Sequence, residues 1–385
     1  MNAALRQTIS FSVALLSVAA PSAVLPQILP GEVERDQVKS ELRLYHDLIL
    51  DYRRGSSGVV ERLLAWDTRR FSRVLSAIEG TDDDTRPWDP IRFKAAAMVH
   101  TDAALQLVER ADLDTALSHL DVAGQLLEKG GPELRPFAAR WTQAAARLLQ
   151  ERGSSPLAER FLERARTRLP NDPTVLYESG MLHERMAGDS VLPTIAYAPE
   201  LRVGRTPTPT RDDRSNQQIT RDDVDNLKRR RAENLNQAAI FLRQSLAADD
   251  SHMLARLHLG RVESLRGRHD DALALLQQSA AAEDPATSYL GLLFIAALHE
   301  RQGALGAAAD SYRAAIDRFP RGHAAYTGLS ALLQRSGRTD ESREVLGRVV
   351  DAAVASRREP WWSYLAEHRS LNIDRFDRLR KEARQ

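Results

Sequence analysis

The sequence contains no cysteine among its 385 residues. Disulfides, thiolate nucleophiles, cysteine metal ligands and a cysteine-linked lipid anchor are therefore excluded together. Net charge is almost absent too, at +1, although 28% of the residues are charged. This balance gives the chain as a whole no strong attraction to nucleic acid or to anionic lipid. Lysine is also scarce, with five lysines against 49 arginines.

Sequence signatures of catalysis and of metal binding are missing as well. The chain has no Gly-x-Ser-x-Gly motif, no phosphate-binding glycine loop and no dinucleotide-binding fingerprint. His183-Glu184 and His299-Glu300 lack the second histidine that a zinc-protease helix requires. Packing or the lining of a groove explains these two histidines better, because each stands in a copy of the same four-residue pattern, Leu-His-Glu-Arg. We therefore expect no catalytic residue, no cofactor and no metal site.

Long hydrophobic runs are lacking except near the N-terminus. Phe11–Leu25 is almost wholly apolar or small and follows a polar stretch that carries Arg6. A run of about 15 residues suits the core of a signal peptide and is shorter than the ~20 needed to span a bilayer. We predict a signal peptide over residues 1–25 and an exported protein, periplasmic or extracellular, with no stable membrane span after cleavage. A retained signal anchor is one alternative, and a first amphipathic helix, which Pro21 and Pro26 disfavour, is another.

What the chain does contain is a repeat. Four stretches share a glycine, a small residue five positions later and another residue seven positions after that, and three of them end on a proline. The sets are Gly153, Ala158, Ala165 and Pro170; Gly267, Ala272, Ser279 and Pro285; Gly303, Ala308, Ala315 and Pro320; and Gly337, Ser342 and Val349. Gly267 and Gly303 are 36 residues apart, and Gly303 and Gly337 are 34 apart. A period of this length predicts a solenoid of helix pairs.

The offsets also predict where each residue lies. Glycine adopts the left-handed backbone at a helix end with little strain, so the repeated glycines are expected at turns between helices. The two small residues, two helical turns apart, allow neighbouring helices to approach closely. The proline is expected to end the second helix. Leu276, Tyr312 and Leu346 each lie nine positions after a glycine and are expected to fill the space between helices.

With these offsets the chain resembles the tetratricopeptide repeat (TPR) family, whose 34-residue unit is a helix-turn-helix. Leu259-Gly260, which precedes Gly267 by seven residues, resembles the Leu-Gly pair of the family's first helix. The resemblance implies an all-α fold, a right-handed α-solenoid of antiparallel helix pairs. It also implies a protein that binds proteins or peptides and has no chemistry of its own.

The repeats and the helical periodicity divide the chain. Residues 31–130 are predicted to form N-terminal TPR-like helix pairs, and residues 134–350 the main TPR array. Within the array, residues 189–230 are predicted as an insertion of about 40 residues at a turn, since a loop of that length is usually disordered or functional. We expect the insertion to be flexible. The alternative is a flap that folds over the groove or docks a partner.

The run Lys228–Arg231 lies at the end of that insertion. Four cations near the start of a helix could contact phosphates. Acidic residues such as Asp225 and Glu233 flank the run, however, and no aromatic residue nearby could stack on a base. A solvated, charge-balanced start of a helix is the favoured interpretation, and we expect no nucleic-acid partner.

Aromatic residues gather after the last repeat, at Trp361-Trp362 and Tyr364. We predict that residues 359–385 form a C-terminal capping segment, whose aromatic side chains cover the otherwise exposed end of the solenoid. A docking site for a partner is the alternative.

The groove-facing positions of the TPR family lie at fixed offsets in the first helix of each pair. Carried over to this chain, they imply a partner-binding groove of mixed charge, formed by Tyr177, Glu184, Arg185, Arg261, Ser264, Leu293, Glu300, Arg301, Gln334 and Arg335. Leu293 is the apolar exception, and ordinary packing against a neighbouring helix is its alternative explanation. The Lys and Asn pattern with which some family members clamp a C-terminal carboxylate is absent at these positions.

The favoured function is an exported scaffold or adaptor that binds a protein or peptide partner in the concave groove of the solenoid, with no catalysis. One alternative is an accessory subunit or enzyme that acts on cell-envelope material, with the 189–230 insertion contributing the site. Another is a structural subunit that assembles through the two ends of the solenoid. No constellation of residues supports the enzyme.

Overall fold

The computed structural model describes residues 30–66, 73–74, 77–78, 88–189, 221–352, 359–365 and 369–385. Within these ranges the chain is helical and contains no strand, which confirms the all-α prediction for this part of the chain. The predicted signal peptide, residues 1–25, lies outside the described residues, as do residues 190–220 of the predicted insertion. None of the described helices is both long and apolar enough to cross a bilayer.

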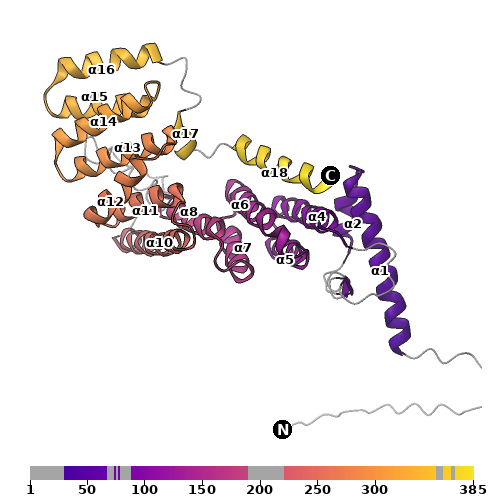
Figure 1. The fold of residues 1–385 in the computed structure, drawn as a ribbon. Coiled ribbons are helices and arrows are strands. Elements are labelled where there is room, and N and C mark those ends of the chain that lie inside the picture. The colour runs from indigo at the N-terminus through magenta and orange to yellow at the C-terminus, as the bar shows by residue number, and fades with distance from the viewer. Residues whose placement is uncertain are drawn as a thin grey trace, which may run out of the picture.

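The helices follow one another as a row (Figure 1). The first part of the row consists of α1 (Pro30–Arg53), α2 (Val59–Leu64), α4 (Pro90–Glu109), α5 (Leu113–Lys129), the 3₁₀ helix η1 (Pro132–Leu134), α6 (Arg135–Glu151) and α7 (Ser155–Arg168). The second part consists of α8 (Pro173–Asp189), α10 (Arg221–Ala248), α11 (Met253–Leu265), α12 (His269–Ala280), α13 (Pro285–Arg301), α14 (Leu305–Arg318), α15 (His323–Arg335) and α16 (Thr339–Ala352). Two further helices, α17 (Pro360–Leu365) and α18 (Arg369–Arg384), follow α16.

The row is built from packed pairs: α4 with α5, α6 with α7, α8 with α10, α11 with α12, α13 with α14, and α15 with α16. Each pair also contacts the next, for example through α12 and α13, so the array is a solenoid. The first helices also contact one another, α4 with α6, α6 with α8, α8 with α11 and α11 with α13. We call the surface formed by α4, α6, α8, α11, α13 and α15 the first-helix surface.

The turn glycines behave as the sequence predicts. Gly153, Gly267, Gly303 and Gly337 have φ angles of 74, 81, 73 and 76°. A Cβ added at any of the four would meet nothing within 4 Å, so the left-handed backbone, and not crowding, requires glycine there. The predicted turns between helices are confirmed at all four positions.

The small residues of the repeat lie between helices, as predicted. Ala308 and Ala315 on α14 are both 0% exposed, and Ala272 and Ser279 on α12 are also 0% exposed. Helices α12 and α13 therefore approach each other closely. A Cβ added at Gly291 of α13 would lie 2.8 Å from the Ala280 backbone nitrogen of α12. Any larger residue at these places would push the two helices apart.

Two predicted boundaries differ from the structure. Arg221–Arg230 was expected in the flexible insertion but belongs to α10, where local contacts such as Lys228 Nζ to Asp225, at 3.4 Å, follow helical spacing. The density of charge in this stretch conceals its helical periodicity. Pro285 does not end a helix. It occupies the first turn of α13, where a missing N–H is tolerated, and Asp284 caps that helix by accepting the Thr287 N–H at 2.8 Å.

The C-terminal segment takes a different path from the predicted cap. α17 contacts α13, and α18 contacts α6, α4 and α1, so the segment returns along the row towards its N-terminal end (Figure 1). Leu346 of α16, expected to be buried, is 44% exposed. The reason is that α16 belongs to the last pair, and within the described residues no further pair packs against it.

Candidate functional site: the first-helix surface and its C-terminal occupant

Tyr364 of α17 is held by charged residues from two successive helix pairs. Its hydroxyl donates a hydrogen bond to Glu184 Oε1 of α8 over 2.9 Å and accepts one from Arg261 of α11. Arg261 also forms an ion pair with Glu184 at 3.0 Å. A single phenol therefore joins two repeats and the C-terminal segment at one point.

His258 of α11 completes this network. Its Nδ1 atom lies 2.7 Å from Glu184 Oε2, and its ring stacks on that of Tyr364 with the centroids 5.0 Å apart. Burial raises the pKa of Glu184, but His258 and then Arg261 outweigh burial and lower that pKa to about 2. Burial, followed by the charge of Glu184, raises the pKa of Tyr364 well above its usual value. At neutral pH the network therefore pairs a carboxylate with a protonated phenol.

An aromatic cluster surrounds the network. Phe294 of α13 presents its ring to Tyr364 at 5.1 Å in an edge-on arrangement, and Trp361 stacks on Tyr364 at 6.0 Å. The Arg261 guanidinium lies over the rings of Tyr364 and Phe294, 4.8 and 5.4 Å from their centroids. Edge-on aromatic pairs and cations over ring faces are both favourable geometries, so the cluster adds to the hydrogen bonds that hold α17.

Glu359, just before α17, contacts two further helices of the first-helix surface, α13 and α15. Its Oε1 atom accepts hydrogen bonds from the Tyr289 hydroxyl of α13 at 2.7 Å and from the Ala324 backbone N–H of α15 at 2.8 Å. The first N–H groups of a helix have no partner within the helix, and the N-cap of α15 is Gly322, which has no side chain to supply one. Glu359, which is 1% exposed, thus provides the missing cap from 35 residues away.

α18 binds the opposite half of the first-helix surface through ion pairs. Arg380 pairs with Asp102 of α4 at 2.6 Å, and Glu382 pairs with Lys94 of α4 and Arg140 of α6, both at 3.0 Å. The Asp102 carboxylate also accepts the Tyr52 hydroxyl of α1 at 2.7 Å. Beneath these charges two apolar residues of α18 are buried, Leu379 at 4% and Ala383 at 0% exposed.

The ten residues predicted to line a groove have different surroundings. Glu184 and Arg261 hold Tyr364. Tyr177 and Leu293 are 3% and 5% exposed and pack inside the helix array, in agreement with the alternative given for Leu293. Gln334 and Arg335 are exposed on α15. The remaining residues mainly join one first helix to the next, and Arg335 does so as well. The contacts are those of Arg185 with Gln150, Arg301 with Ser264, and Arg335 with Glu300.

Sequence reasoning missed several residues of this site. His258 directly precedes the Leu259-Gly260 pair, and Phe294 directly follows Leu293, so both stood beside positions that had been singled out. Tyr289 gave no signal. Trp361 and Tyr364 were noticed as aromatic residues but were expected at the end of the solenoid. The spacing of the residues could not show that they return to the first-helix surface.

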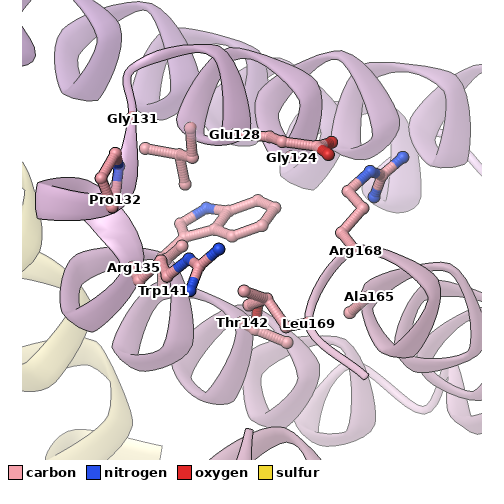
Figure 2. A pocket seen from close by; sticks show the side chains of 12 residues that line it. Gly124, Glu128, Gly131, Pro132, Arg135, Trp141, Thr142, Ala165, Arg168 and Leu169 are labelled. Carbon is pink, nitrogen blue, oxygen red and sulfur yellow. The ribbon is translucent and has the colours of Figure 1, made fainter. Parts of the chain in front are cut away.

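A separate cavity of about 180 Å³ lies between α5, α6 and α7 (Figure 2). The Trp141 indole lies at its centre, and the indole N–H donates to Thr101 Oγ1 at 2.9 Å. Arg168 at one side pairs with Asp121 at 3.0 Å and packs over Gly124, where an added Cβ would lie 2.6 Å from the guanidinium. The cavity contains none of the predicted groove residues and is distinct from the surface that α17 occupies. Among the described residues, no group of three or more His, Cys, Asp or Glu side chains could hold a metal ion.

Comparison with known proteins gives a likeness of backbone only. No family model matches the chain, and no curated protein matches it. Among solved structures, PilW, a type IV pilus biogenesis factor, is 14% identical with a TM-score of 0.40, covering 70% of this chain and 98% of its own. TTC0263, a TPR protein of Thermus thermophilus, is 19% identical with a TM-score of 0.37, covering 62% of this chain and all of its own. MamA of Desulfovibrio magneticus RS-1 is 16% identical with a TM-score of 0.38, covering 57% and 97%. By its own helix pairs and turn glycines, the described part of this chain is an all-α solenoid.

Proposed function

We propose that this chain is a protein-interaction scaffold whose first-helix surface binds a helical segment of a partner protein, with no catalysis of its own. One observation carries the proposal: this surface already binds a short helix, α17, through Tyr364, Glu184 and Arg261. Buried polar contacts within an aromatic cluster are the features that dominate binding energy at protein interfaces. A helix laid against such a surface is a common mode of peptide recognition.

The contacts of α17 indicate what a partner segment would present. Glu359 supplies an acid, and Trp361 and Tyr364 supply aromatic rings two and five positions later. The acid satisfies the N-terminus of α15, and the phenol pairs with Glu184 and Arg261. A partner helix with the same acid and aromatic spacing would satisfy the same groups, and one without it would leave buried hydrogen-bonding groups unsatisfied, at a cost of about 1–3 kcal/mol each.

In this proposal α17 competes with the partner. Because α17 is tethered to the array, its effective concentration at the surface is on the order of millimolar. A partner in solution therefore displaces it only by binding more tightly, for example by also replacing the contacts of α18. The tail thus keeps the surface closed to weak, unspecific ligands.

The experiment uses a fluorescent peptide with the sequence of residues 359–365, titrated against the full chain. Glu359→Gln combined with Trp361→Ala loosens the tail and should bind the peptide, whereas the unaltered chain should bind it roughly tenfold more weakly. Adding Arg261→Met to the loosened tail should abolish binding. Arg313→Met is the matched control, because Arg313 is exposed on α14 and its ion pair, within the part of the chain that the structure describes, is with Asp310 of the same helix. Equal binding by the Arg261 and Arg313 variants would contradict the proposal.

A partner is identified by gentle crosslinking and affinity isolation from the native host. The loosened-tail variant should recover one stoichiometric protein in larger amounts than the unaltered chain, and the Arg261→Met variant should recover less. Recovery that is the same for all three would place the partner site elsewhere on the molecule.

We further propose that the protein acts outside the cytoplasm, in the periplasm or the extracellular space. The apolar stretch Phe11–Leu25 supports this, because its length suits a signal peptide. Mass spectrometry of the protein from its native host should show an N-terminus that begins after about Ala23. An intact Met1 on soluble cytoplasmic protein would refute the export proposal.

A further inference from the structure

A second site lies between α10 and the end of α11, away from α17. An open cleft of about 410 Å³ is bounded on one side by α10 and on the other by the turn from α11 into α12. Its lining is basic and contains no acidic and no aromatic residue: Lys228, Arg231, Ala232, Leu235, Asn236, Leu265, Arg266 and Arg268. The volume is within the range of small-molecule sites, which starts at about 300 Å³.

One face of α10 directs its residues to this cleft. Lys228, Arg231, Ala232 and Leu235 follow the spacing of a single helical stripe, so two of the four cations in the run Lys228–Arg231 line the cleft. Arg229 and Arg230 belong to the same run, are exposed and do not line it. The structure thus divides a run that is uniform in sequence into two residues at the cleft and two outside it.

The cations of the cleft outnumber the carboxylates that are paired with them. Glu263, 1% exposed, is the common partner of Arg243, Arg266 and Arg268, at 3.0 Å from Arg266 and 3.3 Å from Arg268. A single carboxylate cannot balance three guanidinium groups, each of which has five N–H donors. Lys228 is partly balanced by Asp225 at 3.4 Å. Arg231 forms no ion pair or hydrogen bond with any residue that the structure describes.

The repulsion between these cations is visible in their pKa values. Burial lowers the pKa of Arg266, Glu263 opposes this, and the charges of Arg268 and Arg243 lower it further. The pKa of Arg301 on α13 is lowered by burial, then by Arg261 and then by Arg231. The cations around the cleft therefore destabilise one another, and an anion placed among them would relieve this repulsion.

We propose that this cleft binds a small ligand through its phosphate groups. Phosphate is the anion that clustered guanidinium and ammonium groups recognise best, by charge and by paired N–H donors. Among the described residues the lining has no aromatic ring that would stack on a base, and its arginines are the groups that pair with phosphate. Recognition then depends on the phosphates alone, and pyrophosphate and a nucleoside diphosphate should bind with similar affinity. This site would work independently of the surface that α17 occupies.

The test is calorimetric titration of the full chain with pyrophosphate at low and at moderate salt. The unaltered chain should bind, and Lys228→Gln combined with Arg231→Gln should weaken binding roughly tenfold or more. Arg229→Gln combined with Arg230→Gln is the matched control: it removes the same charge from the same run and should leave the affinity within about twofold. Circular dichroism of all variants checks that the array is folded.

Further arms separate the sources of the phosphate. Titration with ADP should match pyrophosphate. Sedimentation with vesicles of phosphatidate and phosphatidylcholine, compared with vesicles of phosphatidylcholine alone, tests whether a lipid headgroup supplies the phosphate. Binding to the phosphatidate vesicles that is lost in the Lys228 and Arg231 double variant would also support the site. The proposal is overturned if neither pyrophosphate nor phosphatidate vesicles bind, or if both double variants weaken binding equally. Binding of the 359–365 peptide by the loosened-tail protein should not change in either variant, so failure of this site leaves the proposed function standing.

Discussion

α17 and α18 lie on the same first-helix surface but are held there by different forces. The acidic residues that fix α17, Glu184 and Glu359, are 6% and 1% exposed and sit among aromatic rings. The charges that fix α18 are more exposed: the side chains of Arg140, Glu382 and Arg380 are 55%, 34% and 28% exposed, and those of Lys94 and Asp102 are 18% and 15% exposed. One helix is therefore anchored by deeply buried polar groups, and the other by a partly exposed network of ion pairs.

This difference assigns the two helices different roles. A surface ion pair contributes about 0–1 kcal/mol and is screened by salt. A buried pair adds little net stability compared with apolar residues, but removing one partner costs several kcal/mol, so it fixes a position stringently. α17 thus determines where the C-terminal segment docks, and α18 follows it.

Removing the carboxylate at the centre of the α17 network should have the largest effect. Glu184→Ala leaves Arg261, His258 and the Tyr364 hydroxyl without their common partner, and should cost roughly 3–5 kcal/mol of local stability. Hydrogen exchange should rise sharply in residues 359–365 and at the α8–α11 contact. Protection of 359–365 equal to that of the unaltered chain would show that the aromatic cluster alone holds α17.

Acid should loosen two regions in two different pH windows. Burial lowers the pKa of His119 to about 4, so its contribution to stability is complete above about pH 6.5 and is lost as the pH falls towards 4. The pKa of Glu184 is about 2, so the α17 network is intact above about pH 4.5 and weakens as the pH falls towards 2.

As the pH is lowered, hydrogen exchange measured by region should therefore increase first in α4 and α5, and only at lower pH in α17. In α4 and α5, His119 Nδ1 lies 2.9 Å from His100 Nδ1. His119→Gln should narrow the first window without removing it, because burial and then His119 also lower the pKa of His100, and it should leave the second window unchanged. If both regions loosen together, the array unfolds as one unit and the two sites are not separable by pH.

The contrast between local and distant contacts also explains what the sequence could predict. The turn glycine Gly303 and the small residues Ala308 and Ala315 act within one repeat, so their spacing alone locates them. The bond between Tyr364 and Glu184 joins residues 180 positions apart, and nothing in either neighbourhood encodes that distance. Glu184 was found through its repeat offset, but its partner was not.

The C-terminal segment was predicted as a cap because its aromatic residues follow the last repeat. That reasoning used order along the chain as a guide to position in space, which holds between adjacent repeats and fails for a segment that turns back. Gly322 carried a weak signal, because a helix that starts at Gly322 without a capping side chain leaves N–H groups for a distant acceptor. Glu359 is that acceptor.

Removing only the Tyr364 hydroxyl should have a smaller effect. Tyr364→Phe keeps the ring against His258, Phe294 and Trp361 but leaves Glu184 paired only with His258 and Arg261. The expected cost is about 1.5–3 kcal/mol, the usual range for one hydrogen bond to a charged group. Hydrogen exchange in residues 359–365 should rise by about tenfold or more, with a smaller rise in α18, whose docking follows that of α17. A change as large as that of Glu184→Ala would mean that the hydroxyl, and not the carboxylate, organises the network.

The smallest effect should come from α18. Glu382→Gln removes the ion pairs with Lys94 and Arg140, yet it should cost only about 0.5 kcal/mol, because the pairs are partly solvated and the amide can still accept a hydrogen bond. Raising the salt concentration to about 1 M should weaken α18 in the unaltered chain and weaken it less in Glu382→Gln, which keeps only the ion pair between Arg380 and Asp102, since the Debye length falls to about 3 Å. Exchange in residues 377–385, followed at low and high salt, measures both. If the Gln variant also frees α17, the surface pairs of α18 anchor the segment, and the roles inferred for the two helices must be exchanged.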